Sequence, residues 1–305
     1  MNWYFIVNPV AGQGKTGRRW SGYLLRLQIA FPGMEWVLTT RSGEARKLAE
    51  QAIKEGRKGI VAVGGDGTHH EVVNGIVDAG GLTQTIYALL PIGSGNDWVR
   101  THNIPRNLDK WIAMLRAKRL DEQRLGRINY FLGGQPQTRT FANVAGLAYD
   151  AYVVRRTEET GFKNRFIYPL MTLLYLKDFI PNQLRLIYDE HPPVENNFYT
   201  INVGICKYSG GGMSLVPQAN PNGDKFALTY ARHLQIFKIL LQSWRFYTRS
   251  IGEITEVTTT FALDVKVAAI DQAGKVEVEA DGEWLGYGPV EFSLLEERLR
   301  FVTPE

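Results

Sequence analysis

The first 125 residues alternate between short apolar runs and longer amphipathic stretches. The apolar runs predict buried strands at residues 4–7, 34–38, 60–63 and 86–90. The stretches between and after them predict helices at about 18–30, 43–55, 69–78 and 109–117. Strands that alternate with helices in this way are typical of βαβ units. We therefore expect an α/β domain with a parallel sheet over residues 1–125.

From residue 126 onward the pattern changes to short alternating runs. They predict strands at 129–132, 139–143, 183–188, 197–205, 226–230, 257–263, 265–270 and 275–280. Turn sequences such as Asn222-Gly223 and Ala273-Gly274 separate them, which favours a β-rich antiparallel sandwich or barrel over residues 126–295. Two stretches with helical spacing, 168–179 and 234–249, interrupt the strands, and we expect them to pack on the sheet.

Two glycine-rich turns follow predicted strands of the first domain. Gly64-Gly65-Asp66-Gly67-Thr68 comes directly after the run 60–63, and Gly93-Ser94-Gly95-Asn96-Asp97 follows the run 86–92. Turns of this kind meet at the carboxyl edge of a parallel sheet, where ligands bind. Glycines let backbone N–H groups approach phosphate oxygens, and a Mg²⁺ ion could bridge the phosphates to Asp66 and Asp97. One such turn is as often only a turn, but two in succession predict a nucleotide site.

Two better-known phosphate motifs do not fit the chain. Gly14-Lys15-Thr16 resembles the end of a P-loop, but that motif needs a glycine where Pro9 stands. The dinucleotide fingerprint would need a third glycine at His70 for the first turn or at Trp98 for the second. We expect His69 and His70 to mark a helix start and to lie on the surface.

Composition narrows the class of protein. A chain of 305 residues suits two domains, and the single Cys206 excludes an internal disulfide framework and fits a reducing, cytoplasmic compartment. The start of the chain lacks the pattern of a signal peptide, and the most apolar later stretch, 167–176, contains Pro169 and is too short to span a bilayer. We expect any contact with lipid to be peripheral.

The net charge of +4 is unevenly placed. Lys15, Arg18 and Arg19 cluster near the N-terminus, and Arg100 follows the second glycine turn. This basic cluster could bind nucleotide phosphates or an anionic membrane surface. We expect no nucleic-acid partner, because the chain contains no recognisable nucleic-acid module. Whether it forms a homodimer is left open.

An ordered set of motifs covers nearly the whole chain. The run Asn8-Pro9-Val10-Ala11-Gly12, the two glycine turns, Phe141-Ala142-Asn143-Val144-Ala145-Gly146 with Asp150, Gly210-Gly211-Gly212-Met213 with Pro217, and Asp281-Gly282-Glu283 follow one another. This order resembles the diacylglycerol kinase catalytic domain family, which includes bacterial soluble lipid kinases and sphingosine kinases. Its nucleotide domain is related to those of NAD kinases and phosphofructokinases through the Gly-Gly-Asp-Gly turn. The resemblance implies that the tail 296–305 returns to the first domain.

The resemblance also implies an ATP-dependent lipid kinase that uses Mg²⁺ and acts on diacylglycerol, a sphingoid base or another lipid. Glu283 would be the general base, and Asp66 would organise Mg-ATP. The positions that would contact the nucleotide are Asn8, Pro9, Gly12, Thr39, Gly65, Asp66, Gly67, Thr68, Glu71 and Ser94. Asp97 would join Asp66 in a metal–water network, and Asp224 would bind a structural Mg²⁺.

Two positions depart from the family pattern. Arg124 stands where many members carry an aspartate that supports the catalytic glutamate, and an arginine near Glu283 would lower the pKa of that carboxyl. The Asp-Gly pair of the structural metal loop is inverted here to Gly223-Asp224. Two alternatives therefore stay open, namely a catalytically weak nucleotide- or lipid-binding protein and an enzyme similar to NAD kinase.

Overall fold

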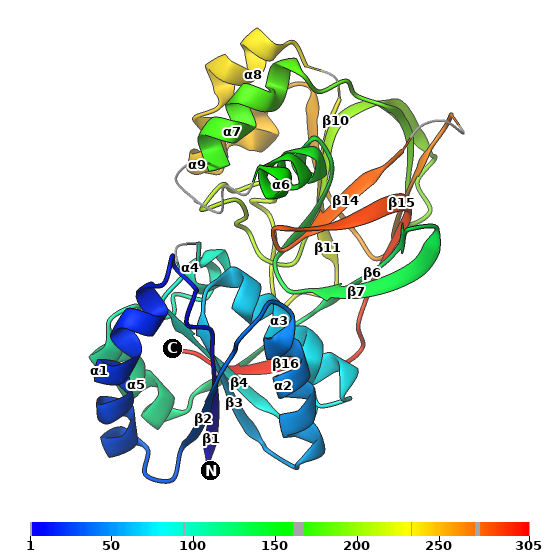
Figure 1. Cartoon of the computed structure of the whole chain (residues 1–305). Helices are drawn as coiled ribbons and strands as arrows, with labels where there is room; N and C mark the ends of the chain where they lie inside the picture. The colour runs from blue at the N-terminus through cyan, green and yellow to red at the C-terminus, as the bar shows by residue number, and fades with distance from the viewer. Residues whose placement is uncertain (1, 94, 161–167, 233, 272–274, 305) are drawn as a thin grey trace. The chain divides into compact units, whose positions relative to one another are not determined.

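The computed structural model describes residues 2–93, 95–160, 168–232, 234–271 and 275–304. The chain forms two compact units (Figure 1). Unit 1 comprises Met1–Arg124 and Glu296–Glu305, and unit 2 comprises Leu125–Leu295. The chain therefore leaves unit 1 once, forms unit 2, and returns to unit 1 for its last residues.

Unit 1 is built on a sheet in the order β2-β1-β3-β4-β16-β5. Its strands are β1 (Trp3–Val7), β2 (Glu35–Leu38), β3 (Gly59–Gly64), β4 (Ile86–Pro91), β5 (Leu120–Gln123) and β16 (Leu299–Val302). Strands β2, β1, β3, β4 and β16 run parallel to one another, and the edge strand β5 pairs antiparallel with β16. The buried apolar runs of β3 and β4 explain why these strands lie in the middle of the sheet.

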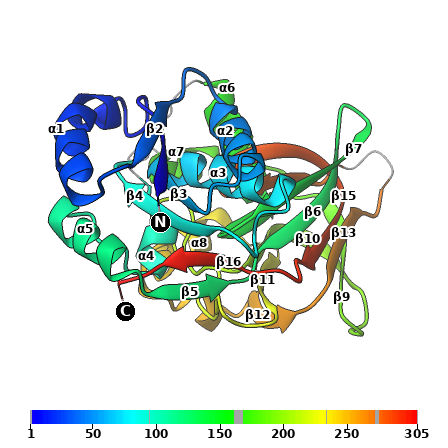
Figure 2. The same cartoon turned by 90° about the horizontal axis from the view of Figure 1, so that it is seen from below.

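Helices cover both faces of this sheet (Figure 2). They are α1 (Lys15–Ala30), α2 (Glu44–Lys54), α3 (Asp66–Asp78), α4 (Asp97–Thr101) and α5 (Leu108–Ala117). Helices α1 and α5 lie on one face, and α2 and α3 lie together on the other. The expected α/β domain with a parallel sheet is confirmed, although α4 and β5 were not predicted.

The expectation for the two histidines is wrong. His69 and His70 are both fully buried, because α3 begins at Asp66 and already packs on the sheet over its first turn. The Nδ1 atom of His69 lies 2.7 Å from the hydroxyl of Tyr87 on β4, and its ring lies 4.7 Å from that of Trp98. These residues therefore belong to the core of unit 1.

Unit 2 is an antiparallel sheet that closes on itself. Its strands are β6 (Gly126–Leu132), β7 (Gln135–Phe141), β8 (Val144–Ala148), β9 (Gln183–Tyr188), β10 (Val194–Gly204), β11 (Phe226–Arg232), β12 (Val257–Ala262), β13 (Val265–Ala269), β14 (Glu277–Ala280) and β15 (Glu283–Leu294). The ring runs β10-β8-β14-β15-β13-β9 and closes where β9 also pairs with β10. Closure removes the exposed strand edges of this ring and confirms the expected β-rich antiparallel domain.

The helices of unit 2 differ in part from the expected ones. Helix α6 (Tyr149–Glu159) was not predicted; the other segments are α7 (Tyr168–Leu174), the 3₁₀ turn η1 (Tyr175–Lys177), α8 (Ile236–Gln242), α9 (Arg245–Thr248) and the 3₁₀ turn η2 (Ile251–Glu253). The expected helix over 234–249 is broken at Ser243, whose hydroxyl donates to the carbonyl of Leu240, 2.9 Å away. A serine side chain that bonds a nearby backbone carbonyl in this way competes with the regular hydrogen bonds of a helix.

Candidate active site

The two glycine-rich turns meet at the carboxyl edge of the sheet in unit 1. Gly64 at the end of β3 pairs with Pro91 at the end of β4, and the N–H of Gly93 donates to the carbonyl of Gly64 at 2.9 Å. A Cβ atom on Gly93 would lie only 2.3 Å from the Cα of Gly65. The glycines are therefore required because one backbone lies directly against the other.

Asp66 joins the first turn to the second. Its Oδ1 accepts a hydrogen bond from the N–H of Asp97 at 2.8 Å, and its Oδ2 accepts one from the N–H of Asn96. A Cβ atom on Gly95 would lie 1.9 Å from the same Oδ2. These contacts place the backbone of Asp97 next to Asp66. The carboxyl group of Asp97 is almost fully buried, and its Oδ1 lies 3.9 Å from the Nε of Arg100.

The segment after β1 is tied to the first glycine turn. The Nδ2 of Asn8 donates to the Oγ1 of Thr68 at 3.0 Å. Gly12 has a left-handed φ of 61°, and a Cβ there would lie 2.7 Å from the carbonyl of Ile92, which directly precedes the second turn. The residues proposed from the first, second and third motifs thus lie along one edge.

Thr39 and Glu71 reach this edge from two other elements. The N–H of Thr39, directly after β2, donates to the carbonyl of Val7 at 2.8 Å, so the ends of β2 and β1 lie side by side. The carboxylate of Glu71 on α3 accepts from the N–H groups of Gly43 at 2.9 Å and Ala45 at 3.0 Å. Glu71 therefore holds the start of α2 in place.

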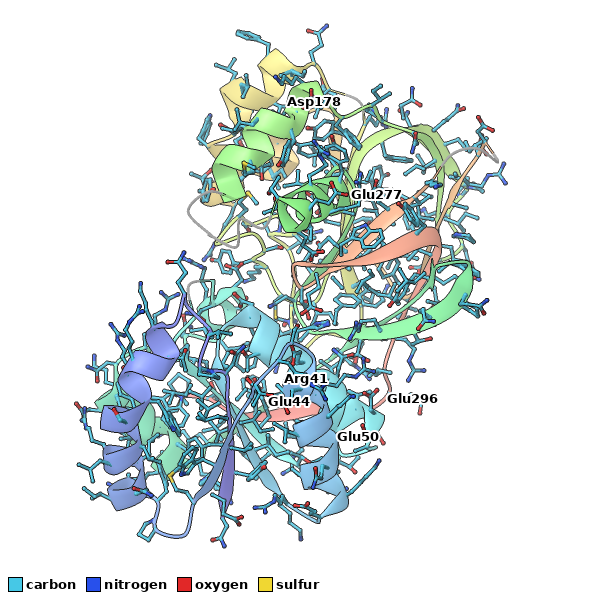
Figure 3. The ribbon with its side chains drawn as sticks, viewed as in Figure 1. Arg41, Glu44, Glu50, Asp178, Glu277 and Glu296 are labelled. Atoms are coloured by element: carbon cyan, nitrogen blue, oxygen red, sulfur yellow. The ribbon has the colours of Figure 1, made fainter. Side chains whose placement is uncertain are left out.

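Glu44 fixes the loop before α2 in the same manner. Its Oε2 accepts hydrogen bonds from the N–H groups of Thr40 and Arg41 and from the hydroxyl of Thr40. Figure 3 shows Arg41 and Glu44 at the start of this helix. The sequence analysis assigned no role to Glu44. Of the residues proposed to contact a nucleotide, Ser94 lies outside the described residues.

In unit 2, Glu283 follows a two-residue turn that joins β14 to β15. The turn residues Asp281 and Gly282 have φ values of 52° and 84°. Positive φ at both positions is the geometry of a type I′ turn, which matches the twist of a hairpin and favours an Asp-Gly pair. Glu283 is half-buried and is the first residue of β15.

Asp281 and Glu279 hold this turn from two sides. The carboxylate of Asp281 accepts from the N–H groups of Ala142 at 3.0 Å and Asn143 at 2.8 Å, directly before β8. The Oε2 of Glu279 accepts from the N–H of Gly282 at 2.9 Å. The backbone that presents Glu283 is therefore anchored by one carboxylate on each side.

A cluster of buried and half-buried polar side chains lies next to the turn. Burial raises the pKa of Glu279 well above its usual range, and burial also raises the pKa of Asp150. Asp150 accepts a hydrogen bond from the hydroxyl of Thr200, to which the Nδ2 of Asn202 donates at 3.0 Å. Sequence reasoning quoted Asp150 within a motif but missed Glu279, Thr200 and Asn202, because strand alternation alone does not mark which polar residues face inward.

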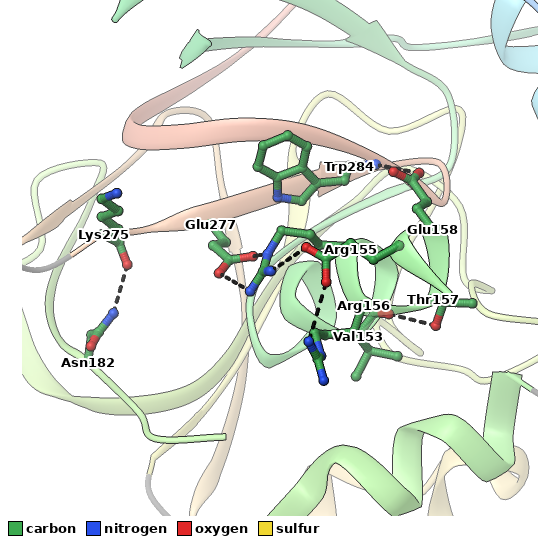
Figure 4. Close-up of polar contacts among 10 residues, drawn as sticks. Val153, Arg155, Arg156, Thr157, Glu158, Asn182, Lys275, Glu277 and Trp284 are labelled. Atoms are coloured by element: carbon green, nitrogen blue, oxygen red, sulfur yellow. Dashed lines mark hydrogen bonds and ion pairs between the residues drawn. The ribbon is translucent and has the colours of Figure 1, made fainter. Parts of the chain in front are cut away.

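Helix α6 packs against the same hairpin through charged side chains (Figure 4). The guanidinium of Arg155 donates to both carboxylate oxygens of Glu277 on β14, at 2.8 and 3.0 Å. The carboxylate of Glu158 accepts from the N–H of Trp284, the residue after Glu283, at 3.3 Å. The helix therefore supports both strands of the hairpin, and the second of these, β15, carries the candidate base.

The remaining candidates lie elsewhere in their units. Gly210, Gly211 and Gly212 all have positive φ and form a turn closed by bonds between Ser209 and Met213, while Asp224 is exposed in the loop before β11. No group of three or more His, Cys, Asp or Glu side chains in the described part of the chain could hold a metal ion by itself. The metal roles of Asp66, Asp97 and Asp224 stay predictions.

Arg124 ends the first part of unit 1. Its Nη1 donates to the carbonyl of Glu296 at 2.8 Å, where the chain returns to this unit. The residue thus ties together the two segments that enter and leave unit 1. An effect of Arg124 on Glu283 stays a prediction.

Two family models match the chain in succession. Residues 2–128 match the diacylglycerol kinase catalytic domain, and residues 143–303 match the YegS C-terminal NAD kinase beta sandwich-like domain. The chain belongs to the diacylglycerol kinase catalytic domain family. This membership agrees with the ordered motifs of the sequence and places the protein among the lipid kinases.

Full-length relatives and solved structures agree with the family. YtlR of Bacillus subtilis is 28% identical over 314 residues, which cover 99% of each chain. A diacylglycerol kinase of Mycobacterium tuberculosis is 25% identical and covers 98% of this chain and 94% of its own. The crystal structure of a diacylglycerol kinase from Bacillus anthracis matches 99% of this chain and 96% of its own with a TM-score of 0.72 at 20% identity, which shows a common fold.

A membrane-spanning helix is not found in the described part of this family member. None of the helices there is long and apolar enough to cross a bilayer.

Proposed function

We propose that this protein transfers the γ-phosphoryl group of ATP to the hydroxyl group of a lipid such as diacylglycerol or a sphingoid base. The observation that carries the proposal is the junction of the two glycine turns through Asp66, which brings glycine backbone and the starts of α3 and α4 to one point. Membership in a family of lipid kinases supports a lipid as the acceptor.

The edge of unit 1 is suited to the phosphates of ATP. Glycine turns without side chains let backbone N–H groups approach phosphate oxygens, and the N-terminus of α3 adds partial positive charge there. The residues proposed to contact the nucleotide are Asn8, Pro9, Gly12, Thr39, Gly65, Asp66, Gly67, Thr68, Glu71 and Ser94. Glu71 would act by holding the start of α2, because its carboxylate oxygens bind backbone N–H groups.

Asp66 and Asp97 fit a Mg²⁺ ion by their chemistry. Mg²⁺ prefers carboxylate, phosphate and water oxygens, and it is usually held by only one or two carboxylates. The hydrogen bonds from the N–H groups of Asn96 and Asp97 fix the orientation of the Asp66 carboxylate at the end of the sheet. Bound Mg²⁺ would neutralise the charge that develops on the phosphates. Asp224 would serve a separate structural Mg²⁺.

Glu283 is the proposed general base. Its carboxylate would take the proton of the lipid hydroxyl while the hydroxyl oxygen attacks the γ-phosphorus and ADP leaves. A base needs a fixed position, and the carboxylates of Asp281 and Glu279 hold the turn that precedes Glu283. We expect the enzyme to work as a peripheral protein on the cytoplasmic face of a membrane, with Lys15, Arg18, Arg19 and Arg100 exposed toward anionic headgroups.

A lipid-extract screen with γ-labelled ATP and Mg²⁺ tests the proposal. The purified chain is expected to label one lipid class, and a parallel reaction with NAD in place of lipid is expected to stay unlabelled. Label in NAD would instead support an enzyme similar to NAD kinase. If ATP binds but neither acceptor is labelled across the whole extract, the protein is a binding protein and the proposal fails.

A further inference from the structure

The helices at one end of unit 2 carry apolar side chains on both faces. The inner face forms a small core in which Tyr175, Leu176, Ile239 and Ile254 are buried against Tyr149. The outer face is exposed, and we call it the α7–α9 face. Its exposed members are Leu173, Leu174, Ile180, Ile236, Phe237, Leu240, Leu241, Trp244 and Tyr247. Figure 1 shows α7, α8 and α9 side by side.

This concentration sets the face apart from the rest of the described surface. Among the described residues, nineteen large apolar side chains are exposed, and the nine of the α7–α9 face come from residues 173–180 and 236–247 alone. Single exposed apolar residues are ordinary, whereas a contiguous group marks a surface that binds something.

Helix α8 gives the clearest reason to expect a covering partner. Of its residues Ile236–Gln242, only Ile239 is buried, and Lys238 is its one charged residue. Phe237 and Leu241 are 74% and 65% exposed. A helix whose exposed side carries large apolar side chains is normally covered there by protein or by lipid.

Charge and aromatic residues favour an anionic lipid surface as that partner. The segments 168–180 and 236–249, which carry the α7–α9 face, contain four basic residues and one acidic residue, Asp178. The guanidinium of Arg245 lies 4.8 Å from the centre of the Trp244 ring, and Trp and Tyr next to basic residues are typical of the boundary between headgroups and acyl chains. Glu253 pairs with Arg245 and Glu256 pairs with Lys238, so these two carboxylates offset part of the positive charge.

A second copy of the chain fits this face less well. A two-fold symmetric contact would place the same patch of both copies together, so the excess of basic over acidic residues in the patch would meet the same excess on the other copy. An anionic bilayer offers opposite charge and an apolar interior at the same time.

We propose that the α7–α9 face inserts into the boundary between the headgroups and acyl chains of an anionic bilayer. The inference deepens the proposed function, because a lipid kinase must reach a substrate that resides in the bilayer. Insertion itself needs neither nucleotide nor turnover. It would supply an apolar contribution to membrane binding in addition to the charge contribution of the basic residues on unit 1.

Vesicle flotation of the full chain without nucleotide tests this proposal. The vesicles contain phosphatidylcholine and phosphatidylglycerol, and the test variant is the double substitution Phe237→Ser and Leu241→Ser. Its matched control is Leu25→Ser with Ile29→Ser on α1, where the two side chains are 63% and 71% exposed. Substitutions at such exposed positions change folding stability little, which circular dichroism can check.

We expect the Phe237/Leu241 variant to lose vesicle partitioning by on the order of tenfold to a hundredfold, because two large apolar side chains no longer leave water. The Leu25/Ile29 control should partition like the wild type. At high salt, wild-type binding should persist in part, since apolar insertion is not screened. Equal partitioning of the two double variants would overturn the proposal.

Trp244 provides a second, direct readout. Brominated lipid should quench part of the tryptophan fluorescence of the wild type, and Trp244→Phe should remove that quenched part. Quenching that is unchanged in Trp244→Phe would contradict insertion of this face. Light scattering tests whether a second copy of the chain covers the face instead. If the Phe237/Leu241 variant loses self-association but keeps its vesicle binding, the face belongs to a second copy.

A phosphoryl-transfer assay in detergent micelles separates this inference from the proposed function. Loss of vesicle binding by the Phe237/Leu241 variant, in a protein that labels no lipid in micelles, would support insertion and reject the kinase proposal. Lipid labelling in micelles together with unchanged vesicle binding of that variant would support the kinase proposal and reject insertion.

Discussion

Both units anchor their candidate site through an aspartate that accepts hydrogen bonds from two consecutive backbone N–H groups. In unit 1, Asp66 binds the N–H groups of Asn96 and Asp97. In unit 2, Asp281 binds those of Ala142 and Asn143. The same contact has two different roles, because Asp66 joins the two glycine turns of the proposed nucleotide site, whereas Asp281 only shapes the turn before Glu283. The comparison teaches that an aspartate in a glycine turn can be part of the chemistry or part of the support.

The largest effect is expected for Asp66. Asp66→Ala should abolish phosphoryl transfer while the protein stays folded, because both the metal-organising carboxylate and the link between the turns are lost. Asp66→Asn retains one acceptor oxygen at similar volume, and we expect it to lose activity by on the order of 10³-fold at saturating Mg²⁺. Turnover close to the wild type in either variant would remove Asp66 from the chemistry.

Glu283→Gln should lower turnover by roughly 10²–10⁴-fold, the range expected for a lost general base, with ATP affinity little changed. Initial rates and ATP binding measured on the same preparation check both parts. Trp284→Phe, at the neighbouring position, serves as the control for disturbance of β15. A Glu283→Gln enzyme with full activity would assign the base to another residue.

Asp281→Asn sharpens the comparison, since it should affect position rather than chemistry. One of the two backbone N–H groups would lose its partner, at a cost of about 1–3 kcal/mol in the free energy of unfolding. We expect turnover to fall less than in Glu283→Gln, with an unchanged pH profile. Denaturant unfolding and pH–rate profiles of the two variants, measured side by side, test this order. A larger loss in Asp281→Asn than in Glu283→Gln would show that the two roles are reversed.

The smallest effect concerns Glu279, whose pKa is raised by burial. A carboxyl with a higher pKa in the folded state binds more protons there than in the unfolded chain, so the free energy of unfolding should fall as pH rises above about 4.5. Its contribution to the slope is at most about 1.4 kcal/mol per pH unit. Glu279→Gln cannot ionise and should flatten this slope in denaturant titrations at several pH values. Asp150, whose pKa is also raised, would still contribute to the slope in this variant. An identical slope in the variant would show that Glu279 does not titrate differently in the folded state.

The sequence allowed much of unit 1 to be predicted, because buried parallel strands and glycine turns have local signatures. The runs that became β1, β3 and β4 are apolar throughout, and the turns after β3 and β4 are rich in glycine. The burial of His69 and His70 could not be predicted, because it depends on how α3 lies on the sheet. A polar residue at a helix start carries no sign of that packing.

Less of unit 2 could be predicted from local patterns. The alternating strands and the Asp281-Gly282 turn were visible, whereas α6 and the inward-facing Glu279 were not. Glu277 and Glu279 are two residues apart on β14. Glu279 is nevertheless buried, whereas Glu277 pairs with Arg155. Contacts between residues far apart in the sequence make this difference, and only the folded structure displays them.

The central claim is that unit 1 binds Mg-ATP and that Glu283 of unit 2 activates the lipid hydroxyl. The most direct test measures Mg-ATP affinity and transfer of labelled phosphate to lipid for Asp66→Asn and Glu283→Gln together. We predict that Glu283→Gln binds Mg-ATP like the wild type but transfers little label, and that Asp66→Asn loses the Mg²⁺-dependent part of ATP binding as well as transfer. Wild-type Mg-ATP affinity in Asp66→Asn, or wild-type transfer in Glu283→Gln, would contradict the claim.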